Sequence, residues 1–331
     1  MRSWLFAMLF AILSAALATR VGFAQDPPLP EPISTLEAGD FRALAVTTDG
    51  SRLLAADAEN NQVRVYDFAN PEAPEWLMSI DLSGTPKLLT GGDGFSLVAE
   101  TTDEETDLVE VVLPPLPDTR YPITVGSTIP IDKNPRALAL SPDNHWGIVI
   151  SDASYTLLEI NAPDNVDSIP VNTNTPWISA ALSHTNAYFL RENSLDSAPL
   201  DALAALEAAQ TLPFEGTPSA LALNADATAG VIVLDSNRLL FFDAQTLETT
   251  SEFTLDGSAI SSVHFVTSGG EDTLLITQEA SGTIVTLNAA NPQTPQALTA
   301  EVADGRPVRA LATFGEYLII TDGITISIYS P

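Results

Sequence analysis

The stretch that decides the fold is NPRALALSPDN, Asn134 to Asn144, because versions of it recur along the whole chain. The clearest copies are FRALAVTTDG (41–50), PSALALNADA (218–227) and VRALATFGEY (308–317), and weaker copies are PKLLTGGDG (86–94), WISAALSHTN (177–186) and AISSVHFVTS (259–268). Six intervals separate Arg42 from Arg309 over 267 residues, so the mean period is about 44 residues. The chain is therefore a repeat protein with seven copies of one unit.

Each copy has the same internal plan. A short apolar strand runs into a polar turn, and three more strands follow, as in RLLAAD (52–57), QVRVYDF (62–68) and SEFTLDG (251–257). Short segments rich in Val, Ile, Leu and Phe, separated by Asp, Asn, Gly and Pro, favour β-structure. A period of 40–45 residues with four strands is typical of a propeller blade. We predict an all-β fold, a single seven-bladed β-propeller over residues 33–331 with four antiparallel strands per blade; eight or six blades are the alternatives.

The two ends of the repeat region predict how the ring closes. The last copy stops at TISIYSP (325–331) after three strands, whereas ISTLEAGD (33–40) resembles the fourth strand of another copy. Pairing this N-terminal strand into the last blade would remove an open sheet edge. The one helical candidate, LDALAALEAAQ (200–210), is predicted to be an insert between the third and fourth strands of blade 4. Trp76, Trp146 and Trp177 are expected to pack between blades.

The N-terminus has the pattern of a secretory signal peptide. Arg2 precedes an apolar run from Trp4 to Leu17, and small residues at Ala18 and Ala24 mark two candidate cleavage sites. We assign residues 1–24 to the signal and residues 25–32 to a proline-rich linker. The run is shorter than a membrane span needs, so we expect no stable membrane anchor after cleavage. The chain has no cysteine, and export without disulfides indicates a bacterial periplasmic or secreted protein.

The charge excludes one class of partner. Residues 1–24 hold two arginines and no acidic residue, so the remaining chain carries 11 basic and 43 acidic residues, a net charge of −32. Nucleic-acid binding needs clustered Lys and Arg against the phosphates, and anionic membranes also repel an acidic surface. We therefore expect a protein partner or a small anionic ligand, no nucleic acid, and a monomer.

The opening P-x-A-L-A-L-S-P-D-x and the V-x-V-x-D strands together resemble the YVTN/WD40-like seven-bladed β-propeller repeat family, across about residues 33–331. The resemblance implies that the connections between blades and the turns between second and third strands share one face, and that first strands line a central channel. The family includes surface proteins, binding modules and some lactonases. The blade-end Trp-Asp pairs of WD40 repeats and the TGKxxW pattern of quinoprotein dehydrogenases are absent here, and we expect no cofactor.

Basic residues gather at the start of the first strands. Six of the eleven in the mature chain lie at or just before one: Arg42, Lys87, Lys133, Arg136, Arg306 and Arg309. Arginine recognises carboxylates and phosphates through paired hydrogen bonds, and ligands favour concave sites. We interpret Arg42, Lys87, Arg136, Arg306 and Arg309 as a ligand-binding group at the channel mouth.

A second set ends the second strands on the same face. Its members are Asp57, Glu100, Asp152, Glu192, Asp235, Gln278 and Asp322. The alternative interpretation is that the two sets neutralise each other, because cations about 10 Å apart repel by roughly 1.7 kcal/mol at an effective dielectric near 20. The Asp residues would also cap tight turns. Both interpretations stay open.

Catalytic and metal signals are weak. His145, His184 and His264 have no metal-ligand spacing, no GxSxG nucleophile motif occurs, and we interpret the acidic loop TTDEETD (101–107) as a solvated hairpin tip instead of a calcium site. We name no catalytic residue and no metal ligand. Our leading hypothesis is an exported, non-enzymatic binding module. The alternatives are a lactonase-type hydrolase, with Glu100, Glu192 or His264 activating water, and a structural envelope or surface protein.

Overall fold

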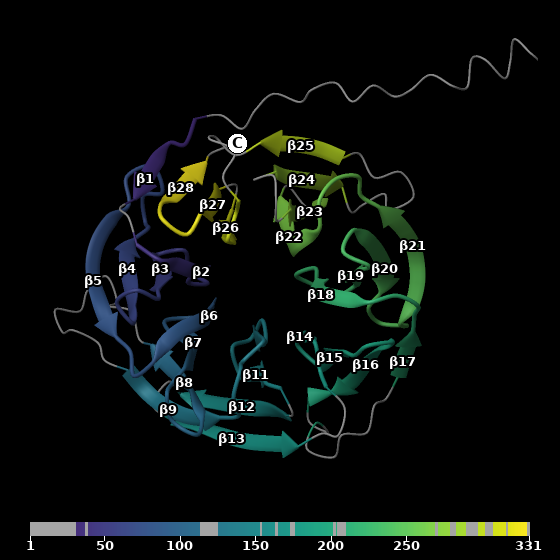
Figure 1. Cartoon of the computed structure of the whole chain (residues 1–331), viewed down its shortest axis with the longest axis horizontal. Helices are drawn as coiled ribbons and strands as arrows, with labels where there is room; N and C mark the ends of the chain where they lie inside the picture. The colour runs from purple at the N-terminus through teal and green to yellow at the C-terminus, as the bar shows by residue number, and fades with distance from the viewer. Residues whose placement is uncertain are drawn as a thin grey trace, which may run out of the picture.

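The computed structural model forms a ring of seven sheets (Figure 1). It describes residues 31–329, except 37–38, 113–124, 153, 163–164, 173–175, 201–202, 204–209, 269–270, 279–282, 289–296, 302–306 and 316. Each sheet has four antiparallel strands, which confirms the predicted all-β propeller of seven blades. The predicted signal segment lies outside the described residues. Within the described part of the chain, no helix is long and apolar enough to span a membrane.

The first three blades follow chain order from the innermost strand outward. Blade 1 contains β2 (Phe41–Val46), β3 (Arg52–Asp57), β4 (Gln62–Asp67) and β5 (Glu75–Asp81). Blade 2 contains β6 (Thr85–Gly91), β7 (Ser96–Thr101), β8 (Asp107–Val112) and β9 (Val125–Ile131). Blade 3 contains β10 (Ala137–Leu140), β11 (Trp146–Ile150), β12 (Ser154–Ala162) and β13 (Asn165–Asn172).

The next three blades repeat this order. Blade 4 contains β14 (Ser179–Leu182), β15 (Asn186–Leu190), β16 (Ser194–Pro199) and β17 (Gln210–Pro213). Blade 5 contains β18 (Pro218–Leu223), β19 (Ala229–Leu234), β20 (Arg238–Asp243) and β21 (Glu248–Thr254). Blade 6 contains β22 (Ile260–Ser268), β23 (Glu271–Gln278), β24 (Thr283–Asn288) and β25 (Ala297–Glu301).

Blade 7 joins the two ends of the chain. It contains β26 (Ala310–Phe314), β27 (Tyr317–Thr321), β28 (Ile326–Tyr329) and, as its outermost strand, β1 (Ser34–Leu36). β1 pairs antiparallel with β28, with Ser34 opposite Ile328 (Figure 1). The predicted closure by the N-terminal strand is confirmed, and it leaves the last blade with the same four strands as the others.

The polar turn that follows each innermost strand explains the SPDN part of the repeat. In blade 3 the Ser141 hydroxyl donates to Asp143 at 2.5 Å, and Asn144 adopts a φ of 61°. In blade 1 Thr47 and Asp49 make the same contact at 2.6 Å, and Gly50 takes the left-handed position with a φ of 70°. Glycine and asparagine accept this conformation more readily than other residues, so both sequences close the same tight turn.

The core lies between the blades. Among the residues that the structure describes, buried apolar side chains form seven clusters in the ring. At the interface of blades 3 and 4, Trp177 packs against Tyr155 and Phe189, with ring centroids 6.1 and 4.9 Å away. Trp146 lies against the same cluster, as predicted. The prediction for Trp76 is wrong: it lies on the outer strand β5 and is 62% exposed.

The insert of blade 4 lies where the sequence predicted it, between β16 and β17. Most of its residues are outside the described part of the chain, so its predicted helical conformation stays a prediction. Leu200 and Leu203 are described, and both are buried in the cluster between blades 3 and 4. The Tyr155 hydroxyl donates to the carbonyl of Leu203 at 3.1 Å. The insert therefore begins packed against the core.

Candidate functional site

One residue in every blade occupies the same place at the start of the innermost strand. It follows a buried apolar residue and directly precedes the first regular pair of the innermost strand with its neighbour. In blades 1, 2, 5 and 6 this residue is the extra one at a register shift, and in blades 3, 4 and 7 its N–H donates to the second strand. The seven residues are Arg42, Lys87, Arg136, Ile178, Ser219, Ser261 and Arg309.

The cations among these residues are contiguous in the ring. Arg309, Arg42, Lys87 and Arg136 belong to blades 7, 1, 2 and 3, which follow one another around the axis (Figure 1). We call these four residues the cationic arc. Blades 4, 5 and 6 carry Ile178, Ser219 and Ser261 there instead. Because blades with Ile or Ser form the same sheet, the fold itself does not require a cation at this position.

At the seam between blades 7 and 1, two arginines share a single carboxylate. Arg42 donates to Asp40 at 3.1 Å, and Arg309 donates to the other oxygen of Asp40 at 3.0 Å. The side chains of Arg42 and Arg309 remain 49% and 54% exposed. This carboxylate neutralises one of the two positive charges, and each guanidinium keeps further N–H groups for another acceptor.

The other half of the arc lies on blades 2 and 3. Arg136 contacts Asp152, and Asn134 donates to the second oxygen of Asp152 at 2.7 Å. The hydrogen bond from Asn134, then Arg136 and the nearby Lys87, lower the pKa of Asp152. Among the described residues no ion pair joins Lys87 to a carboxylate. The hypothesis that the rings neutralise each other therefore holds for Arg136 and Asp152, whereas the ion pairs described for Arg42 and Arg309 are with Asp40, which lies outside the predicted acidic ring.

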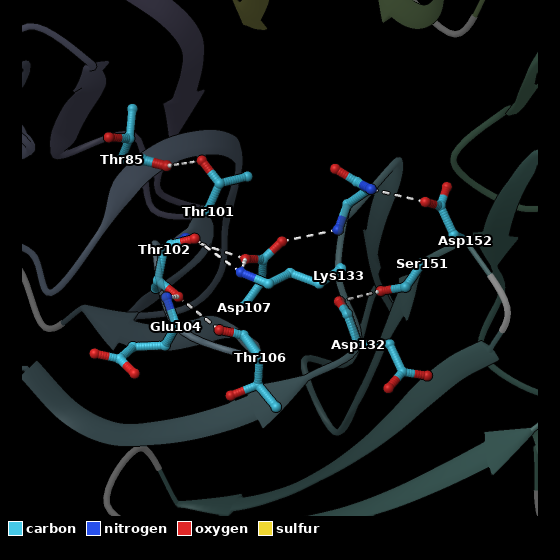
Figure 2. A network of polar contacts seen from close by, with 11 residues as sticks. Thr85, Thr101, Thr102, Glu104, Thr106, Asp107, Asp132, Lys133, Ser151 and Asp152 are labelled. Atoms are coloured by element: carbon cyan, nitrogen blue, oxygen red, sulfur yellow. Dashed lines mark hydrogen bonds and ion pairs between the residues drawn. The ribbon is translucent and has the colours of Figure 1, made fainter.

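Lys133 does not belong to the arc. It lies in the connection between blades 2 and 3, where it donates to Asp107 at 3.0 Å and to the carbonyl of Thr102 at 2.8 Å (Figure 2). The Asp107 side chain is 1% exposed and also accepts the backbone N–H groups of Thr102 and Asn134. Burial acts to raise the pKa of Asp107, but these hydrogen bonds outweigh it, so the pKa is lowered. Lys133 and Asp107 thus fasten the acidic loop to the next blade.

That loop differs from the predicted solvated hairpin tip at its last residue. Residues 103–106 are exposed, as expected, but Asp107 turns inward as the first residue of β8. Across the residues that the structure describes, no group of three or more His, Asp and Glu side chains could hold a metal ion. The acidic loop thus also has a structural role, because its last residue, Asp107, binds the connection to blade 3.

The strand register divides the predicted acidic ring into two sets. Asp57, Glu100, Gln278 and Asp322 lie at one equivalent position, deduced from the pairs Phe41–Asp57, Pro86–Glu100 and Ile260–Gln278 and, in blade 7, from Ala310–Thr321. Asp152, Glu192 and Asp235 lie one residue further along and are exposed. Sequence alignment of the strand ends could not separate these sets, because the difference is a single residue of register.

Two residues of the first set, Asp57 and Glu100, are fully buried, and their neighbours have opposite charge types. In blade 1 Asp57 accepts from Arg64 of β4, with the ion pair at 2.6 Å. In blade 2 Glu100 lies beside Glu110, which occupies on β8 the position that Arg64 has on β4. Asp57 therefore has a counterion, whereas Glu100 has another carboxyl group.

The pKa values of the two carboxyl groups move in opposite directions. Burial acts to raise the pKa of Asp57, but hydrogen bonds from Asn60 and Arg64 outweigh it and the pKa is lowered. Burial, and then the charge of Glu110, raise the pKa of Glu100 to about 8 against one opposing bond from the Gly84 N–H. One oxygen of Glu100 and one of Glu110 are buried without a hydrogen-bond partner among the described residues. Glu100 is thus held as a protonated acid at neutral pH.

The remaining predicted residues are dispersed. Asp235 pairs with Arg238 at 2.9 Å on the surface of blade 5. Asp322 accepts the N–H groups of Ile324 and Thr325, which confirms a turn-capping role. Glu192 is exposed in a turn of blade 4. Arg306 lies outside the described residues, so its place stays a prediction.

None of the three histidines forms a metal-ligating pair within the described residues. His145 and His184 lie in the turns after β10 and β14. His264 lies in β22, where part of its surface is accessible but the surrounding protein desolvates the ring and lowers its pKa to about 4. At neutral pH His264 is therefore uncharged and adds nothing to the cationic arc.

Sequence reasoning missed Asp40, which joins the two ends of the repeat region through Arg309 and Arg42. A signal was present, because Asp40 and Arg42 are two residues apart and such residues share one side of an extended chain. It also missed Asp107, because nothing in the acidic sequence TTDEETD distinguishes this buried residue from its exposed neighbours.

No protein-family model matches the chain, and no curated protein matches it at a significant level.

Proposed function

We propose that this protein is an exported, non-enzymatic β-propeller binding module that captures an anionic group at the cationic arc. The anionic group is a carboxylate or phosphate on a small molecule or on a partner protein. We further propose kinship with the YVTN/WD40-like repeat proteins, because the recurring ALALSPD openings begin the innermost strands of a seven-bladed ring.

The observation that carries the proposal is an excess of positive charge in one place. The four cations of the arc meet two carboxylates, Asp40 and Asp152, so these six side chains have a net charge of +2. The whole chain has a net charge of −30. A local positive field within an acidic surface attracts anions and orients them as they approach. Because Ser219 and Ser261 serve the fold equally well, binding explains the cations better than folding does.

The geometry at the seam suits a bidentate acceptor. Arg42 uses its Nε and one terminal nitrogen on Asp40, and Arg309 uses one terminal nitrogen. Each guanidinium has five N–H donors in a fixed plane, so both have donors left for a ligand. A planar carboxylate or a tetrahedral phosphate accepts such paired bonds well.

Hydrolysis of a lactone is less well supported. Of the bases assigned to it, Glu100 is completely buried and His264 has a pKa of about 4. Glu192 is exposed in blade 4, which carries no cation of the arc. A binding function needs none of these groups.

Titration calorimetry with citrate and with pyrophosphate tests the proposal. The double variant Arg42→Ser/Arg309→Ser and the single variant Arg136→Ser introduce the residue that blades 5 and 6 use naturally. We expect the double variant to weaken binding of at least one probe about tenfold or more, because charged hydrogen bonds contribute about 1.5–3 kcal/mol.

The matched control is Arg238→Ser, which removes an arginine from blade 5 outside the arc. It should leave the affinity unchanged. Equal losses in Arg238→Ser and in the double variant would indicate a general charge effect and would refute a site at the arc. No binding of either probe by the wild-type protein would also count against it.

A further inference from the structure

A second candidate site lies between the blade that closes the ring and blade 1, and its described lining includes no residue of the arc. A cleft of about 520 Å³ lies between strands of the two blades. Its lining consists of Thr35 and Leu36 of β1, Asn60 in the turn before β4, Gln62, Arg64 and Tyr66 of β4, and Trp76 and Ser79 of β5. This volume falls within the range of about 300–1,000 Å³ that is usual for small-molecule sites. The ring closure therefore leaves a cleft large enough for a small ligand.

Side chains of alternate residues form one wall of the cleft. Gln62, Arg64 and Tyr66 alternate along β4 and thus share one face of blade 1. On the neighbouring strand, Ser79 lies opposite Arg64 and Trp76 lies opposite Tyr66. The wall thus grades from polar side chains at the Gln62 end to two aromatic rings at the Trp76 end.

The cleft is polar but has little net charge. Arg64 is the one ionised side chain among the described residues of the lining, and its charge is balanced by Asp57 at 2.6 Å. Gln62 donates to Asp81 at 2.7 Å, and Asn60 donates to Asp57 at 2.9 Å, so an amide oxygen of each is left as an acceptor. The hydroxyl groups of Thr35 and Ser79 can both donate and accept.

Trp76 is an unusual residue for this position. It is the most exposed of the large apolar side chains that the structure describes, at 62%. An exposed indole has a high cost in water and offers a rigid flat surface of large area. On an outer strand beside polar amides and hydroxyls, that surface is suited to cover one apolar face of a ligand.

These features eliminate most ligand classes. A small anion needs an excess of positive charge, and here the single arginine, Arg64, is matched by one carboxylate, Asp57, whereas at the seam two arginines share one. A cation would need carboxylates, and none is present among the described residues that line the cleft. A wholly apolar molecule would leave several polar side chains without partners, which is costly. We propose that the cleft binds a neutral saccharide, whose hydroxyl groups meet Asn60, Gln62 and Ser79 while its C–H face packs on Trp76.

Intrinsic tryptophan fluorescence tests this inference on the full chain. Maltose, cellobiose, lactose and chitobiose are titrated into the millimolar range, and we expect saturable quenching or a spectral shift with at least one of them. Trp76→Ala should abolish the signal, and calorimetry should show affinity reduced at least about tenfold. Gln62→Leu should weaken binding without removing the tryptophan.

Leu77→Ala is the matched control, because Leu77 is the neighbouring exposed residue at the register shift of β5 and does not line the cleft. It should bind the sugar as the wild type does, and so should Arg42→Ser/Arg309→Ser, since neither arginine is among the described residues that line the cleft. No saturable change with any of the four sugars would overturn the proposal. Binding that survives Trp76→Ala, or quenching by pyrophosphate in place of the sugars, would also overturn it.

Discussion

The two halves of the ring have the same sheets and different chemistry. Blades 7, 1, 2 and 3 carry the cationic arc, the buried Asp57–Arg64 pair and the buried Glu100–Glu110 pair. Blades 4, 5 and 6 have Ile178, Ser219 and Ser261 at the arc position, and at the position of Asp57 they have Arg191, Leu234 and Gln278. The backbone thus accepts neutral or charged residues at both positions.

This difference separates what the fold needs from what the first half adds. The repeat needs a buried residue at the start of the innermost strand and a tight polar turn after that strand, and both halves have these. Arg42, Arg136 and Arg309 are about half exposed, and blades 4, 5 and 6 form the same sheets with neutral residues at this position, so folding alone does not explain these charges. This contrast is the reason why we propose a binding role for the cationic arc.

The largest expected effect comes from removing the counterion of a buried carboxylate. Arg64→Met leaves Asp57, which is 0% exposed, without its partner, and should lower the free energy of unfolding by about 3–5 kcal/mol. Denaturant unfolding measures this loss. The counterpart in the second half is Arg238→Met, whose partner Asp235 is 47% exposed; it should cost less than about 1 kcal/mol. Equal losses would remove the distinction between the halves.

A pH titration of stability should distinguish Glu100 from Gln278. Because the pKa of Glu100 is raised from 4.5 to about 8, the folded state binds more protons than the unfolded state between these values. The contribution of Glu100 to stability is therefore lost as pH rises through this window, by up to about 1.4 kcal/mol per pH unit, and levels off above it. Glu100→Gln, which installs the residue of blade 6, should flatten the slope.

Asp57 provides the control of opposite sign for that titration. Its pKa is lowered from 3.8, so its contribution is present above that value and is lost as pH falls below it. Asp57→Asn should change the acid limb of the stability curve, whereas Glu100→Gln should change the limb between pH 5 and 8. Glu100→Gln with an unchanged slope would mean that the pair in blade 2 is already ionised.

The smallest expected effect on stability is in the arc itself. Arg136 and Asp152 are 49% and 42% exposed, so Arg136→Ser should change the free energy of unfolding by no more than about 1 kcal/mol. The same variant should weaken anion binding. Thermal unfolding and calorimetry on one preparation measure both quantities, and a large loss of stability would show that the arc serves the fold.

Repetition made the architecture predictable from sequence. The copies of PRALALSPDN gave the number of blades, and the unmatched strand at 33–40 gave the closure, because a ring has to pair its last edge. The place of the arc was equally accessible, since Arg42, Lys87, Arg136 and Arg309 hold one position in the repeat. These predictions rest on local pattern, which a single chain shows directly.

Contacts between blades were not predictable in the same way. Asp40 binds Arg309 across 269 residues of sequence, and no local pattern shows that proximity. Glu100 and Asp57 look alike as strand ends, although Glu110 and Arg64 on the next strand give them opposite pKa shifts. Trp76 resembled a core residue by type, and only its place on the outer strand shows that it is exposed.

The most direct measurement of the central claim is a crystal structure of the protein with bound pyrophosphate. We expect phosphate density within hydrogen-bond distance of Arg42 and Arg309, on the seam between blades 7 and 1, with Asp40 still between them or displaced by the ligand. Phosphate found only at Arg238 on blade 5, or a seam with no phosphate at saturating concentration, would contradict an anion-binding arc.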